Sequence, residues 1–198
     1  MVKLILELIG TIAFAVSGAV IGIRKKMDIL GVTVLGVTTA VGGGVIRDLM
    51  IGKAPPAAFS DPVYILVAIA TSLIVFIPAI SRRIDLNRFI WVLADSVGLG
   101  AFTIVGVAAG QPFHNPFFAA FLGILTGVGG GVIRDICAGE IPMIFMKHFY
   151  ACPCIISAVL CTLLYPYHPN AAILSGFFLT VLLRLLAAKF RWHLPKAK

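Results

Sequence analysis

The chain has 198 residues, of which 60% are hydrophobic and 12% are charged, and its mean hydropathy is +1.06. Soluble domains contain about 45–50% apolar and about 25% charged residues, so this composition excludes a soluble globular protein. The net charge of +8 does not indicate binding to nucleic acid, because the basic residues form short clusters between hydrophobic runs, which is the pattern of a membrane topology signal.

Seven charge-poor runs follow one another along the chain, and each is long enough to cross the hydrocarbon core of a bilayer as a helix. An open sheet or coil is excluded at this depth, because lipid offers no partner for backbone N–H and C=O groups. The runs cover approximately residues 4–23, 29–46, 63–80, 89–109, 117–133, 149–165 and 171–188. The sequence therefore predicts an all-α polytopic membrane protein with seven transmembrane helices.

The distribution of lysine and arginine predicts the orientation of these helices. The loops after the first, third and fifth runs, together with the C-terminal tail, contain Arg24, Lys25, Lys26, Arg82, Arg83, Arg88, Arg134, Lys147, Lys189, Arg191, Lys196 and Lys198. The opposite side contains Lys3, Arg47 and Lys53. Because basic loops stay in the cytoplasm, we expect the N-terminus outside and the C-terminus inside an inner (plasma) membrane. Arg184 lies within the last run, about one turn from its cytoplasmic end, and is expected to snorkel there.

One segment occurs twice in the sequence. Residues 36–52 read GVTTAVGGGVIRDLMIG and residues 123–139 read GILTGVGGGVIRDICAG, and the match extends backward to place Glu7 on Asp95. The predicted organisation is a three-helix repeat (1–84), a second three-helix repeat (85–170), and a seventh helix with a basic cytoplasmic tail (171–198). Three helices are an odd number, so the second copy must cross the membrane in the opposite direction. Inverted repeats of this kind place a permeation site near the membrane midplane, between the halves.

Both copies contain three consecutive glycines. Each glycine weakens a helix by about 1 kcal/mol relative to alanine, so a triplet is a local weak point of roughly 3 kcal/mol. Unwound backbone at membrane depth is tolerated where it is buried in protein or lines a water-filled cavity, and its carbonyl groups can coordinate a cation there. Close packing between helices is the alternative interpretation, and the two are compatible. The predicted hinge residues are Gly42, Gly43, Gly44, Gly129, Gly130 and Gly131.

Charged residues accompany each triplet. Charge within a membrane segment usually marks a pathway or an ion pair, so we expect Glu7 to pair with Arg47 and Asp95 to pair with Arg134, one pair at each membrane face. Such pairs would form a gate at each end of a pore, with snorkelling at helix ends as the alternative for the two arginines. The full set of candidate gate residues is Glu7, Arg47, Asp48, Asp95, Arg134 and Asp135.

Other polar and aromatic residues have weaker signals. Hydroxyl groups near the triplets are candidates to line a polar path, although serine and threonine often bond back to their own helix. These residues are Thr38, Thr39, Ser96 and Thr126. Trp91 and Tyr150 are expected to be anchors at the membrane interface. The sequence contains no P-loop, HExxH, GxSxG or dinucleotide motif and no metal-ligand spacing, so we expect neither an enzyme nor a metal site.

The paired GGGVIRD motif, the inverted repeats and the seventh helix resemble the bacterial relatives of the trimeric intracellular cation (TRIC) channels, which are also catalogued as glycine transporter-like proteins. The resemblance covers essentially the whole chain. It implies a homotrimer in a lipid bilayer, a pore in each protomer, conduction of monovalent cations, chiefly potassium, kinks at both glycine triplets, and Arg47 and Arg134 as gate residues. It implies no cofactor beyond permeating potassium or sodium and a bound lipid. The animal channels carry a lysine in the pore helix and bind a phosphoinositide, whereas the run 117–133 contains no lysine.

Two functions are therefore considered. The first is a passive, potassium-permeable channel. The alternative is a secondary transporter of a small zwitterion such as glycine, in which the same hinges provide alternating access while helix dipoles and arginines hold the carboxylate. The residues alone hardly separate the two, and the resemblance favours the channel.

Overall fold

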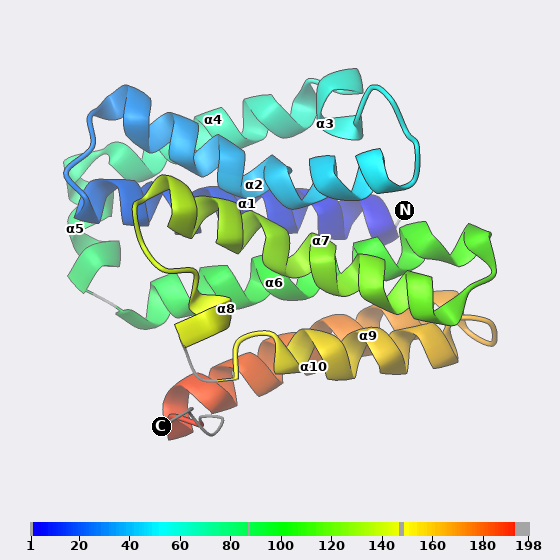
Figure 1. Cartoon of the computed structure of the whole chain (residues 1–198). Coiled ribbons are helices and arrows are strands. Elements are labelled where there is room, and N and C mark those ends of the chain that lie inside the picture. The colour runs from blue at the N-terminus through cyan, green and yellow to red at the C-terminus, as the bar shows by residue number, and fades with distance from the viewer. Residues whose placement is uncertain (1, 87, 147–148, 193–198) are drawn as a thin grey trace.

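The computed structural model describes residues 2–86, 88–146 and 149–192, which form a bundle of helices (Figure 1). This agrees with the all-α class expected from composition. Lys147, Lys196 and Lys198, which the topology prediction counted as cytoplasmic, lie outside the described residues.

Among the described residues, five helices are long and apolar enough to cross a membrane. These are α1 (Val2–Arg24), α2 (Ile29–Met50), α6 (Arg88–Gly110), α7 (Pro116–Cys137) and α10 (Pro169–Phe190). Two apolar helices are shorter, namely α4 (Val63–Phe76) and α9 (Cys152–Leu164). The remaining short elements are α3 (Ala57–Ser60), α5 (Pro78–Leu86), η1 (Gln111–Phe113) and α8 (Met143–Met146). At 1.5 Å per residue α4 is about 21 Å long, less than the roughly 30 Å of a hydrocarbon core, so its length alone does not establish a crossing.

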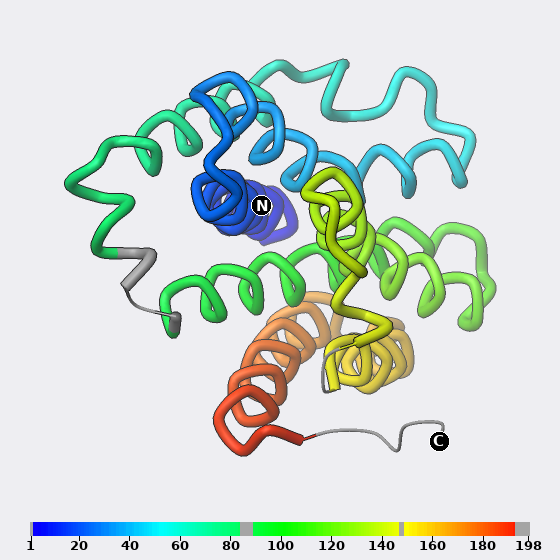
Figure 2. The backbone as a smooth tube through the Cα atoms, turned by 60° about the vertical axis from the view of Figure 1, so that its left-hand side comes forward, coloured from blue at the N-terminus to red at the C-terminus, as the bar shows by residue number. Residues whose placement is uncertain are grey.

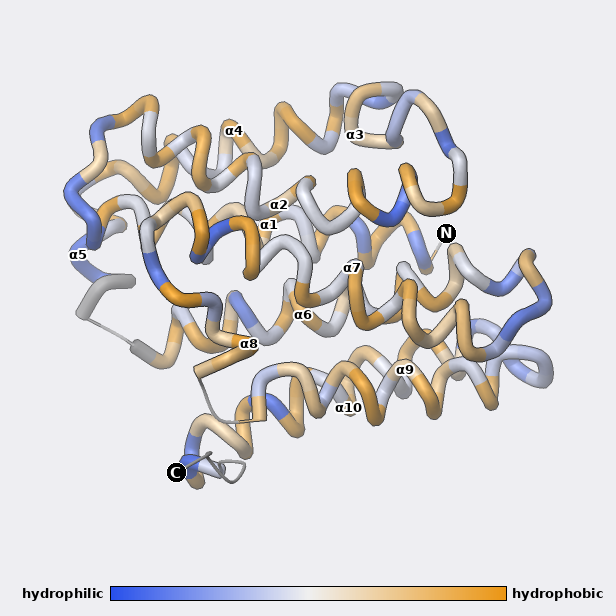
Figure 3. Tube along the Cα trace, in the orientation of Figure 1, coloured by the Kyte–Doolittle hydropathy of each residue, from blue (hydrophilic) through white to orange (hydrophobic). Residues whose placement is uncertain are grey.

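The long helices run back and forth between the two ends of the bundle, and the start of α1 and the end of α10 lie at opposite ends (Figure 1). Hydrophilic segments gather at these two ends, while apolar residues dominate the helices between them (Figure 3). This arrangement matches the solvent pattern that a membrane imposes, because loops contain the backbone groups that need water.

The run 63–80 was expected to be one helix, and this expectation is wrong, because the structure divides it into α4 and α5. Ile77 has φ −58° and ψ 125°, outside the helical region, and it separates the two helices. Steric contact with the ring of Pro78 disfavours the helical conformation at the preceding residue, and proline is well suited to begin a helix.

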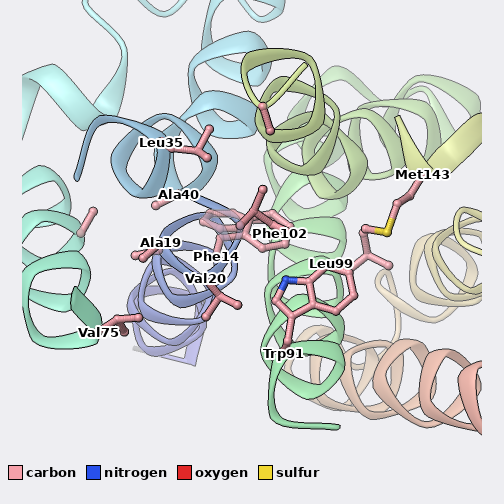
Figure 4. Packing of buried hydrophobic residues seen from close by; sticks show 14 of the residues in the cluster. Phe14, Ala19, Val20, Leu35, Ala40, Val75, Trp91, Leu99, Phe102 and Met143 are labelled. Carbon is pink, nitrogen blue, oxygen red and sulfur yellow. The ribbon is translucent and has the colours of Figure 1, made fainter. Parts of the chain in front are cut away.

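Helix α1 lies at the centre of the bundle and contacts α2, α4, α6 and α7 (Figure 2). The helices of the two repeats pack on their own counterparts, α1 on α6 and α2 on α7. Helix α10 packs against α6 and α9. Where α1 meets α6, the rings of Phe14 and Phe102 stack with centroids 5.4 Å apart, and Leu99 is fully buried beside them (Figure 4).

Both α2 and α7 stay helical through their glycine triplets, so the unwound backbone expected there is not present in this conformation. The glycines instead allow these two helices to touch. A Cβ atom on Gly43 would clash with the carbonyl oxygen of Thr126, and one on Gly130 would clash with the carbonyl oxygen of Thr39. These two contacts are reciprocal, and they correspond to the packing interpretation of the triplets.

Candidate functional site

The first cluster of charged residues lies where α2 ends and consists of Glu7, Arg47, Asp48 and Tyr64. Nη1 of Arg47 lies 3.3 Å from Oε1 of Glu7, and its Nε donates to Oδ1 of Asp48 over 2.8 Å. The Tyr64 hydroxyl donates to Oε2 of Glu7 over 3.1 Å. The ion pair expected between the acid of α1 and the arginine of α2 is therefore present.

The second cluster lies where α7 ends and consists of Asp95, Arg134, Asp135, Tyr150 and Ser17. Nη1 of Arg134 lies 2.5 Å from Oδ1 of Asp95 and also donates to the Ser17 hydroxyl, while its Nε donates to Oδ1 of Asp135 over 2.9 Å. The Tyr150 hydroxyl donates to Oδ1 of Asp95 over 3.4 Å. The expected pairing of Asp95 with Arg134 is thus also present.

The aspartate of each GGGVIRD motif uses its two oxygens for different purposes. One oxygen accepts from the neighbouring arginine, as described above. The other accepts a backbone N–H from the following segment, that of Ala57 for Asp48 (2.7 Å) and that of Met143 for Asp135 (2.8 Å). Each aspartate therefore fixes both the direction of its arginine and the path of the chain after the helix.

The two clusters differ in their access to water. An open pocket of about 400 Å³ reaches Glu7, Arg47 and Tyr64, and a small cavity of about 30 Å³ continues from the same residues to Gly44 and Phe102. About 30 Å³ is room for one water molecule. The Glu7 side chain remains 16% exposed. The Arg47 side chain is 6% exposed, so the first cluster is largely buried but borders on an open pocket that water can reach.

The second cluster is dry, since the side chains of Asp95 and Arg134 are 0% exposed. A pocket of about 230 Å³ approaches it from the end of the bundle and reaches Asp135 and Trp91. The guanidinium carbons of Arg134 and Arg24 each lie 5.6 Å from the centroid of the Trp91 ring. A guanidinium group within about 6 Å of the centre of an aromatic ring is attracted to the ring by a cation–π interaction.

The region between the two clusters is densely packed. The side chains of Phe14, Thr39 and Thr126 are buried there, and the glycine crossing of α2 and α7 lies beside them. The structure is therefore closed at its centre, with one pocket reaching toward it from each end.

The four candidate pore-lining hydroxyl groups all bond back to their own helices. Thr39, Ser96 and Thr126 donate to the carbonyl oxygens four residues earlier and are fully buried, while the half-buried Thr38 donates to Val34. These contacts follow the alternative that the sequence left open. A pore-lining role for these residues stays a prediction.

Three expectations about single residues are wrong. Trp91 and Tyr150 are not interface anchors, because they are 6% and 2% exposed inside the bundle. Arg184 does not snorkel to the surface, because it is 5% exposed and its guanidinium carbon lies 5.0 Å above the centre of the Tyr150 ring. Trp91 and Tyr150 belong to the buried hydrophobic cluster that also contains Met143, and Arg184 lies on Tyr150, so their surroundings are protein rather than interface.

Sequence reasoning also missed Ser17, Tyr64 and Tyr150 as cluster members. The two tyrosines occupy nearly equivalent places in the two repeats, so extending the repeat alignment into the third helix of each half would have drawn attention to them. Ser17 gives no such signal, because it reaches Arg134 only through the packing of α1 against the second repeat. Within the described part of the chain, no group of three His, Cys, Asp or Glu residues could hold a metal ion.

Comparison with known proteins agrees with this architecture. A family model described as "Glycine transporter" matches residues 4–79 and again residues 92–166. The UPF0126 inner membrane protein YadS of Escherichia coli K12 is 40% identical over 195 residues, covering 96% of this chain and 92% of the relative.

Solved structures decide the family. A prokaryotic TRIC channel crystallised in 0.5 M KCl superposes with a TM-score of 0.91 at 33% identity, covering 98% of this chain and 99% of that one. The chain belongs to the TRIC channel family. A second TRIC structure, from a study of conductance through TRIC cation channels, has a TM-score of 0.89 at 38% identity and covers 98% of this chain and 96% of that one. The TRIC fold therefore extends over essentially the whole sequence, and the protein is a helical membrane protein.

Proposed function

We propose that the protein is a potassium-permeable channel for monovalent cations, with a pore through each protomer of a homotrimer. The proposal is supported by the similarity of nearly the whole chain to proteins described as TRIC cation channels. The proposed location is the inner membrane, where the relative YadS is placed, with the N-terminus outside and the C-terminus in the cytoplasm.

The observation that carries the proposal is the pair of similar charge clusters at the far ends of α2 and α7, each approached by a pocket. A path between them would run along the crossing of these helices, past Gly43 and Gly130. In the closed arrangement Arg47 and Arg134 are held by carboxylates, so opening would require these ion pairs to rearrange. Bending is least costly at the glycine triplets, which supports the predicted hinges.

We also propose that residues 1–84 and 85–170 are two inverted three-helix repeats, followed by the seventh helix in 171–198, so that the chain crosses the membrane seven times. The double match of one family model supports the duplication. The reciprocal contacts of Gly43 and Gly130 support a two-fold relation between the halves. The start of α1 and the end of α10 lie at opposite ends of the bundle, which supports an odd number of crossings (Figure 1).

A transporter of a small zwitterion such as glycine is the second candidate. The description of the matching family favours it, and inverted repeats are common in transporters that work by alternating access. In that case the arginines would bind the carboxylate of the substrate instead of guarding an ion path.

The deciding experiment uses the purified protein in liposomes loaded with potassium chloride. Potassium efflux without valinomycin is compared with uptake of radiolabelled glycine, and protein-free liposomes provide the background. A channel predicts efflux that does not saturate at carrier rates and no concentrative glycine uptake. Saturable glycine uptake without a potassium leak would overturn the channel and establish the transporter.

The oligomeric state has its own test. Light scattering of the detergent-solubilised protein should give a protein mass of three 21.1 kDa chains after subtraction of the detergent. A mass of one or two chains, in detergent that preserves potassium efflux after reconstitution, would exclude the homotrimer.

A further inference from the structure

The two clusters have the same local charge balance. Each contains two carboxylates and one guanidinium, Glu7 and Asp48 with Arg47 in the first, and Asp95 and Asp135 with Arg134 in the second. Each cluster therefore carries one excess negative charge. An uncompensated charge inside a protein is strongly unfavourable, so each cluster needs a further source of compensation.

The first cluster obtains this compensation from its pocket. Glu7 and Arg47 line an open space of about 400 Å³, whose lining also includes Lys3 and Lys53. Water and these two lysines can balance the excess charge there, so the first cluster needs no buried counter-charge.

The second cluster has a smaller pocket, of about 230 Å³, which Arg24 and Lys25 line together with Asp135. Asp95 does not line this pocket and is 0% exposed, and a further positive charge near it comes from outside both repeats. Arg184 of α10 places its guanidinium carbon 5.0 Å from the centre of the Tyr150 ring. The hydroxyl of this tyrosine bonds in turn to Asp95. A buried positive charge is thus linked, through one aromatic side chain, to the carboxylate that pairs with Arg134.

The buried groups of this region are only partly satisfied. Among the described residues, Oδ2 of Asp95 and Nε of Arg184 have no hydrogen-bond partner, although both atoms are buried. Nη2 of Arg134 is likewise buried without a partner. Buried polar atoms without a partner are rare in native proteins, and a functional role or a bound water or ion is among their explanations. Asp95 therefore has an acceptor atom available for a ligand.

Arg184 also has room to leave its position. Arg184 lines a cleft of about 1000 Å³, together with Phe89, Trp91, Val92, Met143 and the last turns of α10. A long arginine side chain can swing into this space while α10 stays folded. Leaving Tyr150 would remove the positive charge that lies against the tyrosine bonded to Asp95.

We propose that Arg184 is the tethered counter-cation of the second cluster and a positioning residue for its gate. While it lies on Tyr150, it compensates the excess charge and holds Asp95 on Arg134. When it moves away, a permeating monovalent cation replaces it beside Asp95. Arg184 and the permeating cation thus compete for the same negative charge. This inference rests on the proposed channel function and adds the regulation of one end of the pore.

Potassium efflux from proteoliposomes tests the competition. Arg184→Gln removes the tethered charge and is expected to raise the efflux rate by about tenfold, within the usual range of coupling between two sites. It should also lower the potassium concentration that gives half-maximal flux, because the cation no longer competes with a guanidinium. Arg184→Lys restores a tethered cation and should return both values toward those of the natural sequence.

Lys189→Gln is the matched control. Lys189 lies in the last turn of the same helix, is exposed, and contacts the ring of Phe190 rather than the cluster. This substitution removes the same charge from α10, so it should leave both the efflux rate and the half-maximal potassium concentration unchanged.

If Arg184→Gln forms a folded oligomer and its efflux rate equals that of the natural sequence, the counter-cation role is overturned. It is also overturned if Arg184→Lys does not return the efflux rate toward that of the natural sequence. If Arg184→Gln does not fold, Tyr150→Phe decides the matter, because it keeps the ring beneath Arg184 and removes only the hydroxyl that bonds to Asp95. Raised efflux supports the proposal, and unchanged efflux overturns it. Absence of potassium efflux from the natural sequence would overturn the channel function itself, and this inference with it.

Discussion

The two copies of GGGVIRD are identical in sequence, yet their arginines lie in different environments. Arg47 belongs to a cluster that opens into a pocket of about 400 Å³, whereas Arg134 is 0% exposed and also bonds to Ser17. The partners of the two arginines are otherwise the same in kind, an acid from the preceding helix and the next aspartate in the chain. A repeated motif therefore determines which residues pair, while the helices packed around it determine whether the pair is accessible to water.

The neighbours differ because the chain continues after the second repeat. The first cluster is approached by α4, which contributes Tyr64. The second cluster receives the equivalent Tyr150 just before α9, and α10 then packs on α6 and α9 and adds Arg184. Helix α10 has no counterpart in the first half, so Arg184 is one source of the difference between the clusters, and the bond of Arg134 to Ser17 of α1 is another.

Replacing Arg134 and Arg47 one at a time should give the largest difference in stability between the two clusters. Arg134→Gln leaves Asp95 and Asp135 buried without their partner, so we expect the free energy of unfolding to fall by about 3–5 kcal/mol. Arg47→Gln should lower it by only about 1–2 kcal/mol, since water in the pocket can solvate the remaining carboxylates. Denaturant unfolding of the two variants in the same detergent measures the difference.

The double variant Asp95→Asn with Arg134→Gln provides the control. It removes one charge of each sign, so it should recover much of the stability lost in Arg134→Gln. Equal losses for Arg47→Gln and Arg134→Gln would contradict the assignment of one wet and one dry cluster.

Alanine substitutions in the two glycine triplets should give a second difference in stability, of intermediate size. Gly130→Ala places a Cβ atom against the backbone oxygen of Thr39 and the ring of Phe14, so overpacking should lower the free energy of unfolding by about 1–3 kcal/mol. Gly44→Ala meets only Nη2 of Arg47 at 3.9 Å, so the better helix propensity of alanine should raise stability by up to about 1 kcal/mol.

Both glycine variants are compared by thermal unfolding in detergent, with Gly44→Ala as the matched control for Gly130→Ala. A gain in stability from alanine at both positions would show that the crossing of α2 and α7 is looser than its geometry indicates. The triplets would then act mainly as hinges.

Labelling of a single cysteine, which should perturb the protein least, tests which cluster faces which side of the membrane. Cys137 is exposed at the end of α7, close to the second cluster, and the predicted topology places it in the cytoplasm. A membrane-impermeant maleimide should therefore label it in inside-out vesicles and not in intact cells. Cys137→Ser should abolish this labelling without changing stability. Labelling of intact cells that is lost in Cys137→Ser would reverse the proposed orientation.

Several features of the fold were predictable because they depend on local chemistry. The hydropathy of the seven runs predicted the seven apolar helices to within a few residues at most ends, apart from the division at Pro78, where the proline signal in the run 63–80 was overlooked. The repeat predicted the pairing of Glu7 with Arg47 and of Asp95 with Arg134, because equivalent positions in related sequences make equivalent contacts.

Other features were not predictable from local patterns. An aromatic or basic residue near the end of an apolar run has the same signal whether it faces headgroups or a neighbouring helix, so Trp91, Tyr150 and Arg184 were placed at the wrong surface. The glycine triplets likewise fit either a hinge or a close crossing. Only the position of α7 beside α2 shows that Gly43 and Gly130 act as contacts in this conformation.

The sequence by itself determined the membrane environment, the helices and the residues that pair, because hydrophobicity, helix length and repetition are properties of the chain. The tertiary structure alone decided burial, that is, which ion pair is shielded from water and which side chain supplies its missing charge. Burial depends on helices distant in sequence, such as α10 over Tyr150, and the electrostatic character of a buried pair depends on those neighbours more than on the motif that contains it.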